Sequence, residues 1–287
     1  MIKNKLDSLI ALIDDPDESV FDSVFEEFQK EDISVVDHLE HIWETSLDEL
    51  VQGRIELIIQ KIQFNDTKEK IRNWANQETL DLFEGFFLIS RYQYPELKLK
   101  TILTQLENIR KEIWLEFRNS LTSLEKITIL NHIFFDHFKF HVDLINPDSP
   151  QHCHINRVFD TRKCNPVSIA ILYTLVARTL KLQVSYIDFA KNPLVGYFDR
   201  ELASLAQEDT DQSIVFYINP SNKGAIIGPR EAEYILQVNG GEEREKLTHA
   251  CPDRIVIKRL IEKLIHSYSL IGAEDKLVYL NEIAELL

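Results

Sequence analysis

One stretch, KCNPVSIAILYTLVA at positions 163–177, constrains the fold more than any other part of the chain. Asn165 and Pro166 interrupt the preceding segment, and proline suits the first turn of a helix because the N–H that it lacks would have no partner there. The apolar residues that follow cover most of a helix surface instead of a single stripe. A helix that is apolar all round belongs in the interior, so we predict a buried central helix from Pro166 onward.

Strand-like segments follow that helix at residues 182–189, 194–198 and 213–218. They are rich in the β-branched and aromatic side chains that strands favour. We therefore predict an α+β core in which the central helix packs on a small antiparallel sheet. The acidic stretch 200–212 is expected to be an exposed helical insertion, and residues 239–243 (NGGEE) a mobile linker.

The remaining sequence predicts helices, so the protein as a whole should be mostly helical. Residues 1–75 carry apolar stripes at helical spacing around an Asp-Pro turn, an arrangement that resembles one HEAT-type repeat. Residues 252–287 indicate two helices that break at Gly272 and resemble a tetratricopeptide-like hairpin. We predict three parts: a helical cap at 1–78, a core at 79–245 and a C-terminal helical hairpin at 246–287.

Composition narrows the class of partner. The formal charge of −15 disfavours non-specific binding to nucleic acid or to an anionic membrane surface, because both require a basic face. No run approaches the roughly 20 apolar residues of a membrane span, and Asp14 and Asp15 interrupt the apolar residues near the N-terminus before they reach signal-peptide length. With three cysteines, an odd number, reduced thiols in the cytoplasm are the simplest expectation.

The central stretch also resembles a known family. Residues 162–169 (RKCNPVSI) are similar to the Arg-x-Gly-Asn-Pro-Ile/Val-Ser signature of the bacterial transglutaminase-like (SirB-type) proteins, and residues 216–224 (FYINPSNKG) resemble that family's later Asp-Pro turn. Further similarity lies at residues 114–116 and 130–135. The resemblance implies a papain-like core in which a Cys–His–Asp triad sits at the head of the buried helix.

That triad is missing from the matching positions. The nucleophile position falls on Pro166, the histidine position on Asn192 and the aspartate position on Asn219, and residues 187–199 contain no histidine. Neither proline nor asparagine can attack a carbonyl or act as a general base near neutral pH. We therefore predict a degenerate, non-catalytic core, without cofactor or metal, that binds a protein or peptide in a groove at the head of the helix. The predicted groove residues are Asn165, Ser168, Asn192 and Asn219.

Two alternatives use other chemistry near the helix. Cys164 could serve as the nucleophile of a hydrolase or acyl-transferase, with His152 or His154 as its base, although a thiol in place of the family's glycine is more often inert. Residues 152–154 (His-Cys-His) could bind a metal, but adjacent residues in an extended chain point to opposite sides and ligands usually need wider spacing. The simplest role of Ser168 is a local hydrogen bond to the backbone.

A third hypothesis is that the chain is a structural subunit of a larger assembly. The cap at residues 1–78 resembles scaffolds that mediate protein contacts, and a large exposed apolar patch on residues 1–75 would favour this hypothesis.

Overall fold

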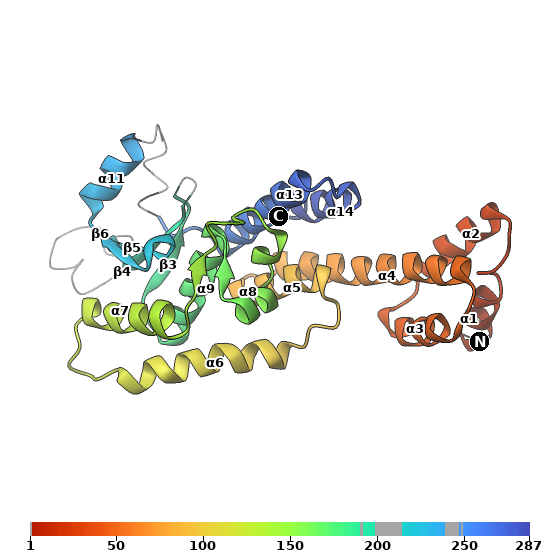
Figure 1. Cartoon of the computed structure of the whole chain (residues 1–287), viewed down its shortest axis with the longest axis horizontal. Coiled ribbons are helices and arrows are strands. Elements are labelled where there is room, and N and C mark those ends of the chain that lie inside the picture. Colours follow the sequence, from red (N-terminus) through yellow and green to blue (C-terminus); the bar gives the residue numbers. More distant parts are fainter. Residues whose placement is uncertain (1, 190–191, 199–213, 239–246, 248) are drawn as a thin grey trace. The chain divides into compact units, whose positions relative to one another are not determined.

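The computed structural model describes residues 2–189, 192–198, 214–238, 247 and 249–287 (Figure 1). The predicted insertion at 200–212 and the predicted linker at 239–243 therefore lie outside the described residues. The chain divides into two compact units, Met1–Asn73 and Trp74–Leu287, and each is described by itself. The three-part division predicted from the sequence stays a prediction.

The first unit is helical. Its elements are α1 (Ile2–Ile10), α2 (Glu18–Phe28), the 3-10 turn η1 (Ile33–Val35), α3 (Val36–Thr45) and most of α4 (Glu49–Ala75). The Asp17 side chain caps α2 by accepting from the Ser19 N–H at 2.9 Å, which places the predicted Asp-Pro turn at the start of α2. The buried Arg54 on α4 donates to the carbonyl of Ile13 at 2.7 Å and so links α4 to the turn between α1 and α2.

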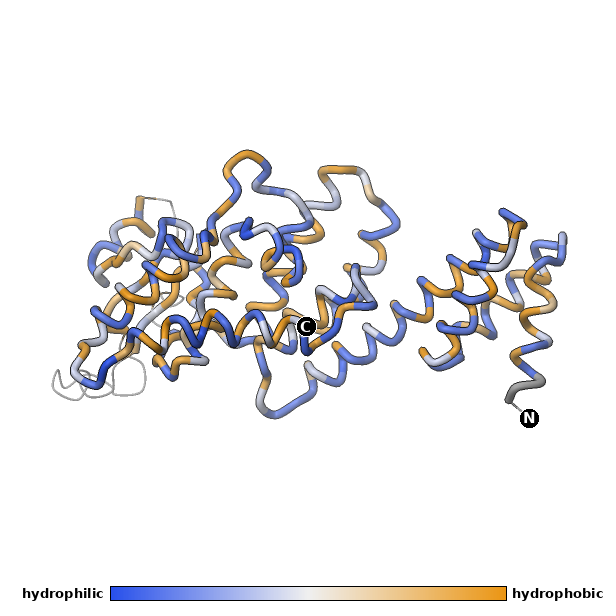
Figure 2. The backbone as a smooth tube through the Cα atoms, turned by 60° about the horizontal axis from the view of Figure 1, so that its bottom comes forward, coloured by the Kyte–Doolittle hydropathy of each residue, from blue (hydrophilic) through white to orange (hydrophobic). Residues whose placement is uncertain are grey.

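The second unit holds the core and is also rich in helices, along which hydrophilic and hydrophobic residues alternate (Figure 2). None of the described helices of either unit combines the length and the apolar character needed to cross a bilayer. The helical elements are α5 (Leu82–Gln93), α6 (Leu99–Glu116), α7 (Ser123–Asn131), the π-helical segment η2 (His132–His137), η3 (Pro150–Cys153), α8 (Ile155–Thr161), α9 (Pro166–Thr179), η4 (Pro220–Asn222), α11 (Pro229–Val238), α13 (Asp253–Leu270) and α14 (Glu274–Ala284).

The predicted central helix is confirmed as α9. From Val167 to Ala177 no side chain is more than 6% exposed, because α5, α6, α13 and the sheet surround the helix. The predicted C-terminal pair of helices is α13 and α14, which meet at Gly272 with a φ of +69°. Its likeness to a tetratricopeptide hairpin stays a prediction.

The sheet has four antiparallel strands in chain order. They are β3 (Val184–Ile187), β4 (Leu194–Phe198), β5 (Ile214–Asn219) and β6 (Ala225–Ile227). The first three match the predicted segments, whereas β6 was not predicted because three residues after a tight turn carry too little periodicity. Leu194 and Tyr217 lie on the face that packs with α11, and α9 packs against β3 and β4. The mostly helical α+β class is therefore confirmed.

A second, two-stranded sheet lies at the entrance to α9. In it β1 (His141–Val142) pairs in parallel with β2 (Lys163–Cys164). The pairing holds the segment after η2 against the residues that precede the central helix. It thereby fixes the approach of the chain to Asn165.

A hydrogen-bonded link joins the turn between β5 and β6 to the helical core. The Tyr173 hydroxyl on α9 donates to Asn131 Oδ1 at 2.7 Å, and Asn131 Nδ2 donates to the carbonyl of Gly224 at 2.8 Å. Gly224 has a φ of +74°, and a Cβ at this position would overlap the Asn131 side chain. The turn therefore requires glycine for its backbone and for the close approach of Asn131.

Replacing this glycine should destabilise the second unit. We expect Gly224→Ala to lower the free energy of unfolding by about 1–3 kcal/mol, because it adds backbone strain and displaces Asn131. Urea denaturation followed by far-UV circular dichroism measures the change. Gly228→Ala is the matched control, since nothing lies within 4 Å of a Cβ there, and equal effects of the two substitutions would contradict the argument.

Candidate functional site

The head of α9 is built as a buried capping box. Asn165 Oδ1 accepts from the N–H groups of Val167 and Ser168, both at 2.9 Å, and Ser168 Oγ accepts from the Asn165 N–H at 3.1 Å. Asn165 and Ser168 are both 0% exposed. The local role expected for Ser168 is therefore present. These two residues of the predicted groove face the interior instead of an open surface.

Both cysteines beside this cap are enclosed in the core. Asn165 Nδ2 donates to Cys153 Sγ at 3.1 Å, and Cys153 and Cys164 are each 0% exposed. Burial raises the pKa of the Cys153 thiol to about 12 and raises the pKa of Cys164 as well, because the thiolate would lose its hydration. At neutral pH both groups are thiols, which are poor nucleophiles.

The two histidines proposed as bases have other surroundings. His154 is buried against the edge of the Tyr94 ring, with ring centroids 5.3 Å apart, and burial lowers its pKa to about 3. His152 is 5% exposed and its Nε2 lies 3.6 Å from Asp143 Oδ2, while burial lowers its pKa despite that carboxylate. No hydrogen bond joins either imidazole to Cys153 or Cys164 in the part of the chain that the structure describes. The geometry therefore assembles no thiol–imidazole pair there.

The remaining predicted positions are spread over other elements. Pro166 is the first residue of α9, and Asn219 ends β5, where its side chain accepts from the Asn222 N–H at 3.2 Å and caps η4. Asn192 is exposed in the segment before β4. The structure brings Asn165 and Ser168 together with the cysteines but leaves Asn192 and Asn219 at the sheet. The triad roles assigned to Pro166, Asn192 and Asn219 stay predictions.

The candidate metal ligands do not converge. The side chains of His152 and His154 are buried among different partners, and two histidines that precede them in the sequence, His137 on η2 and His141 on β1, are exposed. Within the described ranges, no group of three or more histidine, cysteine or acidic side chains is arranged to hold a metal ion.

An open pocket of about 630 Å³ lies beside the entrance to α9. Asp143, His152 and Lys163 supply polar groups to it, and residues 145–151 and the end of α13 complete its wall. Lys163 Nζ lies 3.1 Å from Asp143 Oδ2, and Asp143 Oδ1 accepts from the Ile145 N–H at 2.9 Å. These contacts lower the pKa of Asp143 to about 2, and the hydrogen bond from Lys163 contributes most to that shift. The Asp143 carboxylate is therefore ionised at neutral pH.

Four exposed apolar side chains lie at or next to this pocket, and we call them the apolar rim. Ile145, Leu270 and Ile271 line the pocket and are 85%, 58% and 63% exposed, and Leu144, the sequence neighbour of Ile145, is 86% exposed. Sequence reasoning missed Asp143, Lys163 and these apolar residues. Leu144 and Ile145 lie in a short loop with no periodicity, so only the fold shows that Ile145 lines the same pocket as the end of α13.

Comparison with known proteins supports the resemblance noted in the sequence. A profile of the "Transglutaminase-like superfamily" matches residues 100–262, which is more than half of the chain. The chain is also similar to proteins named "UPF0162 protein" from Xylella fastidiosa strains 9a5c and Temecula1. It is 24% and 23% identical to them, respectively, over 201 residues, which cover 68% of this chain and 67% of each relative. No solved structure matches the chain.

Removing the cap of α9 should lower the free energy of unfolding more than removing an exposed helix cap does. We expect Asn165→Ala to lower the free energy of unfolding by about 2–3 kcal/mol, because two helix N–H groups and the Cys153 thiol lose their partner without access to water. Thr122→Ala, in the exposed capping box of α7, is the control and should cost about 1 kcal/mol. Urea denaturation of both variants measures the two losses in free energy of unfolding. Equal losses would show that burial of the cap is unimportant.

The three thiols should differ sharply in reactivity. Ellman's reagent at neutral pH should modify Cys251 of the native protein, because this residue is partly exposed. Cys153 and Cys164 should stay unmodified until denaturant is added. The physical reason is that burial denies these two thiols both access and ionisation. A Cys251→Ser variant should then show almost no fast reaction. Fast modification of Cys164 in that variant would instead support a thiol enzyme.

Proposed function

The chain belongs to the transglutaminase-like superfamily, and from that premise we propose that it is a non-catalytic member that binds an apolar, extended segment of a partner protein or peptide. The observation that carries the proposal is the pocket beside α9, whose lining combines the Asp143–Lys163 ion pair with the exposed apolar side chains of Ile145, Leu270 and Ile271. Superfamily membership fixes the scaffold, whereas function has to be argued from the site.

The surroundings of the two buried cysteines support the non-catalytic part of the proposal. A cysteine hydrolase needs a thiol within reach of a base and of its substrate. Cys164 is enclosed in the core with a raised pKa, and the two histidines nearest in sequence are directed to Asp143 and Tyr94. Substrate could reach Cys164 only after the packing around the head of α9 had opened.

The form of the pocket supports the binding part. Its volume lies within the range of roughly 300–1,000 Å³ that is typical of ligand pockets. Exposed apolar groups gathered around a concave surface are favoured at sites of protein contact, since covering them removes apolar area from water. Lys163 is 43% exposed at its side chain, so its ammonium group can donate to a carbonyl oxygen of a bound segment while Asp143 holds it in place.

A structural-subunit role remains the second candidate, and one observation favours it. In the first unit Leu47 is 99% exposed, and Leu50 and Leu57, seven residues apart on α4, are 52% and 53% exposed. Residues seven apart lie on the same side of a helix. A partner complex that is lost in Leu50→Asp but kept in Ile145→Asp would favour this role.

We also propose that the protein works in the cytoplasm, without cofactor, and on a protein partner instead of nucleic acid or membrane. The support is the formal charge of −15 and the cysteine count, which is small and odd at three. Anionic surfaces repel such a chain.

Selection of peptides tests the proposed pocket. We expect a phage-displayed library of linear peptides to yield apolar, extended binders of the full chain, and Ile145→Asp and Leu270→Asp should each weaken them by about tenfold or more, because a carboxylate at the rim opposes burial of apolar groups. Fluorescence anisotropy with the selected peptides provides the affinities.

The matched control is Val278→Asp, which places the same charge at an apolar residue 60% exposed on α14 and should leave the affinity nearly unchanged. A library that yields no binder, or binders that tolerate both rim substitutions, would contradict the proposal.

A further inference from the structure

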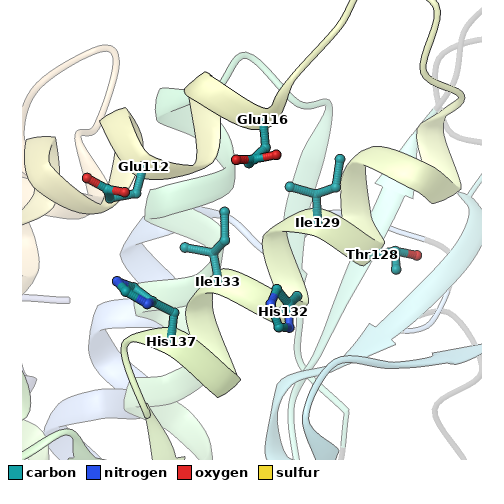
Figure 3. A pocket seen from close by; sticks show the side chains of 7 residues that line it. All are labelled: Glu112, Glu116, Thr128, Ile129, His132, Ile133 and His137. Carbon is teal, nitrogen blue, oxygen red and sulfur yellow. The ribbon is translucent and has the colours of Figure 1, made fainter.

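A second concave surface lies between α6 and the helical run formed by α7 and η2 (Figure 3). Its volume is about 560 Å³, and it shares no lining residue with the pocket beside α9. Glu112 and Glu116, one turn apart on α6, form one wall in Figure 3. The facing wall carries Ile129, Ile133, His132 and His137.

The π-helical segment η2 shapes the facing wall. The Phe138 N–H donates to the carbonyl of Ile133 at 2.9 Å, a bond that spans five residues. Residues five apart in an α-helix lie about 140° apart around the axis, whereas the wider turn of a π-helix brings them closer to the same side. His132 and His137 therefore both border the groove. Single π turns of this kind recur at functional sites.

The charge and apolarity of the groove specify its ligand. Glu112 and Glu116 form no ion pair within the described residues, and on η2 Asp136 Oδ2 lies 3.2 Å from His132 Nδ1. Two carboxylates without an ion-pair partner beside an isoleucine-lined surface favour a ligand that combines positive charge with aliphatic groups.

We propose that this groove binds a basic, amphipathic segment of a partner protein. Its lysine or arginine side chains would meet Glu112 and Glu116, and its aliphatic side chains would cover Ile129 and Ile133. A second copy of this chain is a poor occupant, because two chains of formal charge −15 repel each other. The inference goes beyond the proposed function because it uses a different surface, so either can fail without the other.

The test uses the full chain and a fluorescein-labelled amphipathic peptide built from lysine and leucine. We expect Glu112→Gln combined with Glu116→Gln to weaken binding about tenfold, as expected when charged contacts are lost. Glu40→Gln combined with Glu44→Gln is the matched control, because these glutamates form an exposed pair of the same spacing on α3. It should change the affinity by less than about twofold.

Two results would overturn the proposal: no binding of the basic peptide, or an equal loss of affinity in the two glutamine pairs.

Discussion

The buried amino-terminus of α9 is the constraint on which the core depends. A helix leaves its first N–H groups without intrahelical partners, and in the interior no water can replace them. Asn165 and Ser168 satisfy these groups from within the chain, while Pro166 removes one donor altogether. Because the helix end is satisfied in this way, α9 can be surrounded on all sides by helices and sheet.

The same enclosure determines the chemistry that remains at this site. In a thiol enzyme the head of the helix must open to substrate, and the positive end of the helix dipole must favour thiolate. Here the cap turns inward, Asn165 donates to Cys153, and both thiols lie at zero exposure. In this member of the superfamily the head of the central helix is therefore enclosed by packing.

Two surfaces outside the enclosed core carry the proposals made above. Beside the entrance to α9, Lys163 and two backbone N–H groups hold the Asp143 carboxylate in the ionised form under an apolar rim. Between α6 and η2, by contrast, two carboxylates stand without a described cation beside isoleucines. We propose the first surface for apolar chain segments and the second for basic ones, because exposed apolar side chains characterise the first and unpaired carboxylates the second.

Local signals in the sequence determined the buried helix, its Asn-Pro start, three of the four strands and the break at Gly272. These features depend on periodicity and turn chemistry, which a few consecutive residues carry by themselves. Tertiary structure alone decided that His152 faces Asp143 and His154 faces Tyr94, that β6 joins the sheet, and that Ile145 and Leu270 line the same pocket. Such pairings join residues distant in sequence, so they depend on how whole elements pack and leave no trace in the local pattern.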